Sequence, residues 1–186
     1  MPLTVRTSRV SSAMLELIDV LTVDGRSTGT QKSKAQIHRD GDWHRAAHVW
    51  VVAPDGRVLL QRRSFRKENN PGLWDVSAAG HLSAGESAIE AAVRETREEI
   101  GLAISTHELK YLATMPQSCV LNEGTYFDNE IHEIFLLRRE VDLRSLTLDP
   151  EEVAEVKWVR ELRPDETFVP HGEEYALVAS TIGRLR

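Results

Sequence analysis

Three glutamates are spaced for one face of a helix in the segment GHLSAGESAIEAAVRETREEIGL, which begins at position 80. Glu98 and Glu99 follow Glu95 by three and four residues, so a helix would place their carboxylates beside that of Glu95. Like charges at these spacings destabilise an isolated helix by roughly 0.2–0.5 kcal/mol per pair. A hard divalent cation such as Mg²⁺ or Mn²⁺, which takes oxygen ligands, would convert this repulsion into coordination. The alternative is a solvated acidic face that Arg94 and Arg97 partly neutralise.

The same segment carries the signals of a helix with defined ends. Ser87 occupies an N-cap position, Glu90 three residues later completes a capping box, and Gly101 fits a C-terminal cap. The loop before the helix contains two glycines and places Glu86 at the helix entrance. The apolar face expected to pack on a sheet consists of Ile89, Ala92, Val93, Thr96 and Ile100. The glutamates therefore lie on the other face of the predicted helix.

The spacing of these residues resembles the Nudix box of the Nudix hydrolases. The pattern is Gly80, five residues, Glu86, seven residues, then Arg94-Glu95-x-x-Glu98-Glu99-x-Gly101-Leu102. Thr96 is a mild departure, because the family usually has an aliphatic residue at that position. The resemblance implies an α/β fold in which an α/β/α sandwich surrounds a central mixed sheet within a single domain. It also implies activity on diphosphates linked to another moiety, with Mg²⁺ or Mn²⁺ as cofactor.

The resemblance also implies roles for individual box residues. Glu95, Glu98 and Glu99 would be metal ligands, and the carbonyl of Gly80 would add another. Arg94 would orient a glutamate, and Glu95 or Glu99 would deprotonate the attacking water. The chemistry is consistent, because bound cations stabilise charge on phosphoryl oxygens and lower the pKa of an attacking water. We therefore expect loss of a metal carboxylate to affect turnover more than folding.

Segments outside the box are similar to isopentenyl diphosphate isomerase, over roughly residues 15–178. They include ELIDVLTVDGRSTG, HRDGDWHRAAHVWV, LLQRRSFRKENNPGLWDVSAAGH and DNEIHEIF. The isomerase holds a metal with histidines and acidic residues, and the matching positions here are His44, His81, Asp128 and Glu130. His38 matches less closely, because its distance to His44 differs by one residue. Polar surface or capping roles are the alternative for each histidine, and a hydrogen-bonded core position is an equal alternative for His48.

Basic residues at the end of a predicted strand match the diphosphate site of the isomerase. Arg63 and Lys67 match positions that hold the substrate diphosphate, a role that suits guanidinium and ammonium groups. Arg62 and Trp74 are further candidates for substrate binding. A solvated strand-end cluster is the alternative for the basic residues, and Trp74 fits packing better than substrate stacking.

One departure from the isomerase pattern bears on the type of reaction. The isomerase has a catalytic cysteine just before the glycine and histidine that here are Gly80 and His81, and this chain has Ala79 instead. A methyl group cannot transfer a proton to or from an alkene carbon, whereas a thiol can. Cys119, the single cysteine of the chain, lies in another predicted segment, where buried packing is the more usual role. Together with the complete box, this difference favours hydrolysis over isomerisation.

Hydrolysis of a prenyl diphosphate is the favoured function, because the surroundings of the box resemble the isomerase. The first alternative is hydrolysis of nucleoside di- or triphosphates, which needs a base-reading pocket that the sequence does not identify. Ala79 disfavours an isomerase, and the retained box carboxylates disfavour a non-enzymatic ligand-sensing module. A small-molecule diphosphate is the expected partner, and a homodimer is left open.

The length and net charge of the chain further narrow the possible classes of protein. The 186 residues suit one domain, expected over residues 14–186 after a short polar tail at 1–13. A net charge of −6 argues against nucleic acid as a partner. No apolar run approaches the roughly 18 residues of a membrane span, and the tail lacks the apolar region of a secretory signal. A cytoplasmic location is therefore expected, and a single cysteine excludes an intramolecular disulfide.

The hydrophobic pattern predicts strands and helices without regular βαβ alternation, which favours a mixed sheet flanked by helices. Two apolar runs around a Pro-Asp-Gly turn predict a β-hairpin with strands near 46–53 and 57–63. Further strands are expected at 15–23, 74–80, 108–115, 129–139 and 153–159. An amphipathic helix is expected at 170–186. The polar stretches 31–45 and 64–75 are expected to form loops.

Overall fold

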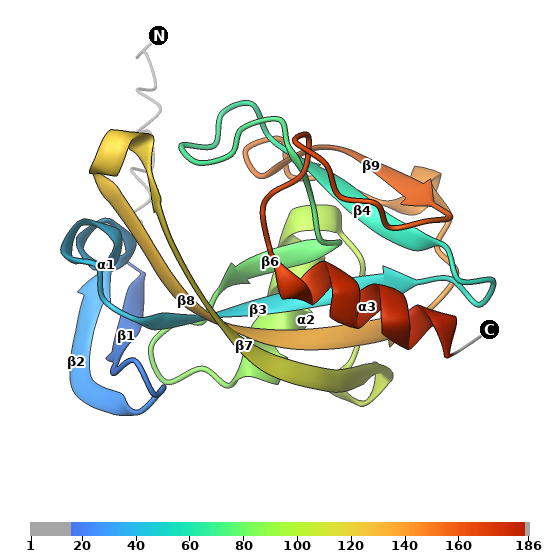
Figure 1. Cartoon of the computed structure of the whole chain (residues 1–186). Helices are drawn as coiled ribbons and strands as arrows, with labels where there is room; N and C mark the ends of the chain where they lie inside the picture. The colour runs from blue at the N-terminus through green and yellow to red at the C-terminus, as the bar shows by residue number, and fades with distance from the viewer. Residues whose placement is uncertain (1–15, 185–186) are drawn as a thin grey trace, which may run out of the picture.

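A mixed β-sheet of seven strands forms the centre of the protein, whose computed structural model describes residues 16–184 (Figure 1). Its strands are β3 His44–Val52, β4 Val58–Arg63, β5 Trp74–Asp75, β6 Ala78–His81, β7 Leu109–Leu121, β8 Tyr126–Arg138 and β9 Val153–Val159. They pair in the order β5–β4–β3–β8–β7, with β6 also beside β3 and β9 beside β4. β3 and β8 run parallel, and the other pairs are antiparallel.

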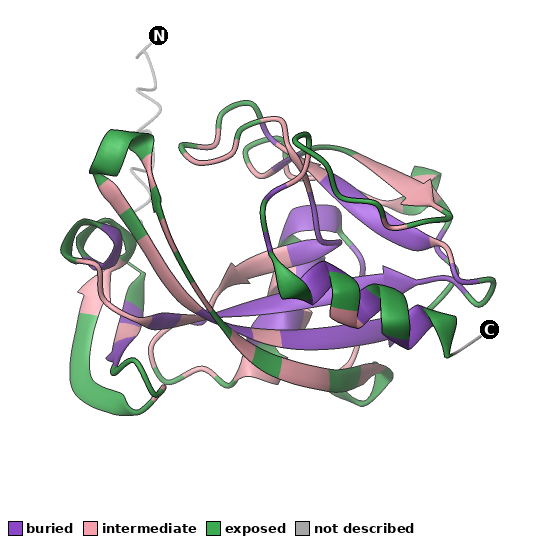
Figure 2. Ribbon diagram, in the orientation of Figure 1, coloured by how far each residue is buried: buried purple, intermediate pink, exposed green. Residues whose placement is uncertain are grey.

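Helices cover both faces of this sheet. Alternate residues of β3 point to opposite sides, so each helix packs against a different set of β3 side chains. Val49 and Val51 belong to the buried cluster that includes α2, Ala88–Ile100. Trp50 belongs to the cluster that includes α3, Glu173–Gly183. Figure 2 shows buried residues along the strands between the two helices. The predicted α/β/α sandwich around a mixed sheet is therefore confirmed.

A two-stranded antiparallel sheet, β1 Leu17–Leu21 with β2 Ser27–Ser33, lies beside this sandwich and leads into a short helix (Figure 1). The helix α1, Lys34–Asp40, occupies part of the stretch predicted as a loop at 31–45, so that prediction is wrong there. The physical reason lies in its two caps.

The caps of α1 stabilise a helix that has little apolar periodicity. Ser33 and Gln36 form a complete capping box, and Gly41 ends the helix in the left-handed region with a φ of 72°. These groups satisfy backbone atoms that a short helix would otherwise leave without partners. Ile37 and His38 are its buried residues.

The boundaries of other strands differ from the predicted ones at points where the strand changes its pairing partner or continues its pairing. The predicted hairpin is confirmed, with Val52 opposite Val58. The strand expected at 74–80 is two strands, because β5 pairs with β4 whereas β6 pairs with β3. β7 and β8 extend beyond their predicted ends, since they pair antiparallel along their whole length up to Leu121 and Tyr126. The final helix occupies a shorter range than the predicted 170–186.

The described residues contain no helix with the length and apolar character needed to cross a membrane. The predicted polar tail at 1–13 lies outside the described residues. The first predicted strand, 15–23, is shorter in the structure and begins at Leu17.

Candidate active site

Helix α2 begins and ends at the caps that the sequence predicts. Glu90 accepts a hydrogen bond from the backbone N–H of Ser87 at 3.2 Å, and Gly101 closes the helix with a φ of 69°. Thr96 is buried and donates its hydroxyl to the carbonyl of Ala92 at 2.7 Å. The polar residue at this usually aliphatic position is therefore satisfied within the helix itself.

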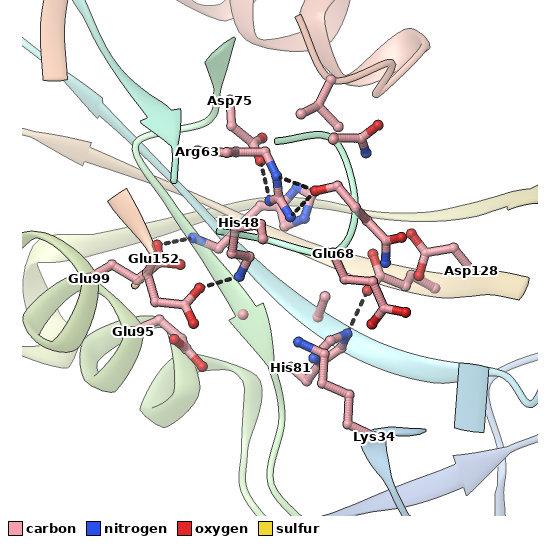
Figure 3. A pocket seen from close by; sticks show the side chains of 18 of the residues that line it. Lys34, His48, Arg63, Glu68, Asp75, His81, Glu95, Glu99, Asp128 and Glu152 are labelled. Atoms are coloured by element: carbon pink, nitrogen blue, oxygen red, sulfur yellow. Dashed lines mark hydrogen bonds and ion pairs between the residues drawn. The ribbon is translucent and has the colours of Figure 1, made fainter. Parts of the chain in front are cut away.

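A cavity of about 460 Å³ lies beside α2 and is lined mainly by charged side chains (Figure 3). Glu95, Glu98 and Glu99 all line it, and Gly80 does so from β6. The three carboxylates predicted as metal ligands are thus brought to one wall. Figure 3 shows Glu95 and Glu99 on this wall, away from His81.

Arg94 connects the acidic groups around the entrance of α2. Its guanidinium donates to both carboxylate oxygens of Glu86, at 2.9 and 2.8 Å. It also donates to Glu95 at 2.6 Å, to Glu98 at 3.1 Å and to the carbonyl of His81 at 3.0 Å. Arg94 is therefore placed to fix the orientation of the box glutamates.

Burial raises the pKa of two box carboxyl groups. It raises the pKa of Glu95 to about 7, although Arg94 acts in the opposite direction. Burial, followed by the charge of Glu95, raises the pKa of Glu99 to about 8. Glu99 was expected on the outward face but is only 4% exposed, and its Oε2 accepts hydrogen bonds from Gln61 (3.0 Å) and the backbone N–H of Ala79 (2.9 Å). Neighbouring carboxyl groups that resist ionisation form a donor set that a divalent cation would stabilise.

Gly80 is suited to the same site because it has no side chain. The carboxylate of Glu95 lies so close to its α-carbon that a Cβ at position 80 would collide with it. The oxygen donors of the three box carboxylates are of the type that a hard divalent cation takes, but they are not among the described groups whose donor atoms all lie within 4.8 Å of one another.

The residues predicted as a second metal site also come together in the structure. One ring nitrogen from each of His38, His44 and His81 lies within 4.8 Å of the others. Oε1 of Glu130 lies 2.9 Å from Nε2 of His81 and 3.5 Å from Nε2 of His44. Oδ1 of Asp128 lies 3.3 Å from Nδ1 of His38. His44 and Glu130 are opposite each other in the β3–β8 pairing, so the sheet register brings them together.

Burial keeps two histidines of this group neutral. It lowers the pKa of His38 to about 3 and that of His81 to about 4. The Nε2 atoms of His38 and His44 are buried and have no hydrogen-bond partner among the described residues. Burial opposes ionisation of Glu130, but contacts with His132, His44 and His81 hold its pKa well below the ordinary value. Burial also opposes the charged form of His44, but its contacts with Glu130 raise its pKa. The neutral imidazoles of His38 and His81 beside the ionised Glu130 fit a divalent cation.

Two of the predicted substrate-binding residues line the cavity, and a third cation joins them. Arg63 lines it while donating to Asp75 at 2.9 Å, and Lys67 lines it while pairing with Glu152. Lys34 lines it from α1. The sequence reading missed Lys34, because its helix was predicted as a loop.

Arg62 and Trp74, the other two candidates for substrate binding, lie outside the lining of this cavity. The guanidinium of Arg62 stacks near Phe65 and Trp74, at 5.0 and 5.8 Å from their ring centroids. Nζ of Lys157 lies 3.6 Å from the centroid of Trp74. The register of β4 against β9 shifts between Arg62 and Arg63, and only Arg63 lines the cavity.

The two residues that bear on isomerase chemistry lie in different places. Ala79 lines the cavity, next to Gly80. Cys119 lies on β7, is partly buried, and is not among the residues that line the cavity. Burial raises the pKa of its thiol to about 11.

His171 is a cavity residue that the sequence reading missed entirely. Its Nε2 donates to Oδ1 of Asp75 at 2.6 Å, across a separation of 96 residues. No local pattern indicates a contact between residues so far apart.

The fold and the carboxylate-lined cavity define a class of α/β/α enzymes, and comparisons with known proteins agree with the fold. A model of the NUDIX domain matches residues 42–175, and the chain belongs to the Nudix hydrolase family. Nudix hydrolases generally use divalent metal ions. The match begins after α1, so the small β1–β2 sheet lies outside it.

Individual relatives are similar over most of this chain. Nudix hydrolase 3 of Arabidopsis thaliana is 42% identical over 147 residues, which are 77% of this chain but only 19% of that protein. An isopentenyl-diphosphate Delta-isomerase of Streptomyces griseus is 33% identical over 170 residues, 86% of this chain and 80% of that protein. The crystal structure of a MutT protein from Methanosarcina mazei Go1 matches with a TM-score of 0.59 at 21% identity, over 76% of this chain and 94% of that one.

Proposed function

We propose that this Nudix hydrolase cleaves a small diphosphate compound by attack of water on phosphorus, with Mg²⁺ or Mn²⁺ as cofactor. The observation that carries the proposal is the set of Glu95, Glu98 and Glu99 on one wall of a cavity that also contains Arg63 and Lys67. A diphosphate needs cations on its oxygens, and these residues offer a metal-binding wall and basic groups in one space.

Residues of the chain would have two roles in this reaction: to hold the cation and to accept a proton from water. When bound, the cation stabilises phosphoryl charge and lowers the pKa of the attacking water. Glu95, Glu98, Glu99 and the carbonyl of Gly80 would hold it, and Arg94 would keep the carboxylates oriented. Glu95 or Glu99 would accept the proton of the water, a role open to a carboxylate that the bound cation keeps ionised.

A second cation would be held by His38, His44, His81, Asp128 and Glu130. The support is the buried Nε2 atom of His38, which has no hydrogen-bond partner among the described residues, and the buried Nε2 atom of His44, 3.5 Å from the ionised Glu130. Because the residues lie in or beside the same cavity, this cation would act on the same substrate.

The cavity lining bears on the group that the diphosphate carries. A prenyl group is supported by relatives named isopentenyl-diphosphate Delta-isomerase, at 33–35% identity. A prenyl chain needs a continuous apolar slot, but the aliphatic side chains in the lining are those of Ala46, Ala79 and Val169. We therefore favour a substituent with hydrogen-bonding groups, as in a nucleoside or sugar diphosphate, and keep the prenyl diphosphate as the alternative.

The decisive experiment is a screen of phosphate and pyrophosphate release from prenyl diphosphates, nucleoside di- and triphosphates and sugar nucleotides. We expect release that requires Mg²⁺ or Mn²⁺ and disappears in Glu98→Gln. The side chain of Glu98 is 59% exposed, so this variant should keep its thermal midpoint in EDTA. Absence of release from every compound, or undiminished release by Glu98→Gln, would contradict the proposal. Conversion of isopentenyl diphosphate to its dimethylallyl isomer would instead support an isomerase.

A further inference from the structure

Four buried side chains at the start of α3 form a cluster that the proposed hydrolysis does not use, although two of them, His48 and His171, also line the cavity. His48 comes from β3, His132 from β8, His171 from the loop before α3, and Glu174 from the first turn of α3. Their exposed fractions are 2%, 1%, 8% and 1%. One ring nitrogen of each histidine and one carboxylate oxygen lie within 4.8 Å of one another. We call this set the α3 cluster.

The two oxygens of Glu174 have different surroundings. Oε1 accepts a hydrogen bond from the indole N–H of Trp50 at 2.7 Å. Both oxygens lie 3.0 Å from Nδ1 of His48, and Oε2 also lies 3.1 Å from Nδ1 of His132. Donor atoms bound to one tetrahedral Zn²⁺ at about 2.0 Å are roughly 3.3 Å apart. The two distances from Oε2 to the histidine nitrogens, 3.0 and 3.1 Å, are close to this spacing.

The histidines are also oriented as metal ligands usually are. A ligating imidazole commonly donates its other ring N–H to a carboxylate, which fixes the ring and its tautomer. Nε2 of His171 lies 2.6 Å from Asp75, and Nε2 of His132 lies 2.9 Å from Glu130. The opposite nitrogen of His171, Nδ1, is left for another partner, whereas Nδ1 of His132 lies 3.1 Å from Glu174, a hydrogen bond that a shared ion would replace.

The Nδ1 atom of His171 distinguishes a metal site from an ordinary polar core. It is buried and has no hydrogen-bond partner within the described part of the chain. The ring centroid of His171 lies 4.9 Å from that of His48 and 5.5 Å from that of His132. A purely structural network explains why Glu174 is bonded to strands β3 and β8, but it leaves this nitrogen unsatisfied, at a cost of about 1–3 kcal/mol.

We propose that His48, His132, His171 and Glu174 form a binding site for a divalent cation of the zinc class. Three imidazoles and one carboxylate suit Zn²⁺ or Co²⁺, whereas the all-oxygen box suits Mg²⁺. Four protein ligands close the coordination shell, as in structural zinc sites. The ion ties the start of α3 to β3 and β8, and its ligands are not among the residues that the proposed hydrolysis uses, although His132 and His171 contact Glu130 and Asp75 of the cavity.

The test measures how many zinc ions each chain binds and where in the structure they bind. Protein stripped with a chelator is dialysed against Zn²⁺ with excess Mg²⁺ to fill the oxygen-rich box, and bound zinc is measured by mass spectrometry of the metal. The variants are Glu174→Gln, which keeps the side-chain shape, and His171→Asn. The matched control is His107→Ala, an exposed histidine outside both histidine clusters. Crystals of the wild type grown with Zn²⁺ provide an anomalous map at the zinc edge.

We expect Glu174→Gln and His171→Asn each to bind one zinc ion fewer per chain than the wild type and His107→Ala. We also expect Zn²⁺ to raise the thermal midpoint of the wild type more than that of either variant. The anomalous map should contain a peak among the four side chains. Equal zinc content in wild type and a folded variant, or a map with peaks only elsewhere, would overturn the proposal. If neither variant folds, the map of the wild type decides alone.

Discussion

The carboxylate of Glu95 lies directly against the backbone of Gly80. A Cβ added at position 80 would come within 2.1 Å of this carboxylate, far inside a non-bonded contact distance. Gly80→Ala therefore has to displace Glu95, and a misplacement of about 1 Å near the chemistry can lower turnover by roughly 100-fold. We expect a decrease of that size in kcat, measured by steady-state kinetics on the substrate that the release screen identifies.

Gly183→Ala is the matched control for that substitution. A Cβ at Gly183 would meet no heavy atom within 4 Å, so we expect wild-type kcat. If Gly80→Ala also kept full kcat, Glu95 would tolerate displacement and would not be a metal ligand.

The sequence predicted those elements whose signals lie within a few residues of one another. The caps of α2 and the turn before Val58 are local features, and both are present in the structure. The caps of α1 are equally local, at Ser33 and Gly41. Helix α1 was missed because seven mostly polar residues are too few to show a helical hydrophobic period. Its capping box was the signal that could have revealed it.

The part of the candidate site that belongs to the box could be predicted from the spacing of its residues. The contacts that depend on packing between distant segments could not. Glu95, Glu98 and Glu99 belong to one helix, so their proximity follows from helical geometry. Glu174 meets His132 across 42 residues and His48 across 126 residues. These contacts depend on where α3 packs on the sheet, and no periodicity in the sequence encodes that position.

Lys67 should contribute to substrate binding more than to the chemical step. Its ammonium group lines the cavity and carries a charge that can contact a diphosphate in the ground state. Loss of a charged hydrogen bond costs about 1.5–3 kcal/mol, which corresponds to roughly 10–100-fold in affinity. We therefore expect Lys67→Ala to raise KM by this factor with little change in kcat.

Arg66→Ala is the control for Lys67→Ala. Arg66 is exposed, pairs with Glu151 and does not line the cavity. We expect its KM to stay close to the wild-type value. The same increase in KM for both variants would mean that Lys67 acts only through the general surface charge.

Thr96 should be replaceable by the kind of residue that Nudix boxes usually have at this position. Its buried hydroxyl donates only to the carbonyl of Ala92, one turn earlier in the same helix. Thr96→Val loses this hydrogen bond, worth about 1 kcal/mol, and gains a buried methyl group of similar worth, about 0.8 kcal/mol. We expect the free energy of unfolding, measured with urea, to change by less than about 1 kcal/mol. A much larger loss would mean that the hydroxyl has a further role in the core.

Glu99 should make the metal-free protein less stable as pH rises. Burial and the neighbouring Glu95 raise its pKa from the ordinary 4.5 to about 8. Between these two values the folded state keeps a proton that the unfolded chain has lost. Stability therefore falls with rising pH across this window, because the folded state binds more protons there.

Glu99→Gln removes this titration while keeping an oxygen that can accept the hydrogen bonds of Gln61 and the Ala79 backbone. In EDTA, the thermal midpoint of the variant relative to wild type should be lowest near pH 4.5, rise as pH increases, and level off above about pH 8. Saturating Mg²⁺ should reverse the order at high pH, since the wild type gains stability from the bound ion and the variant has lost a ligand. Thermal melts across this pH range, with and without Mg²⁺, measure both effects. Parallel pH profiles for the two proteins in EDTA would show that Glu99 is ionised in the metal-free fold.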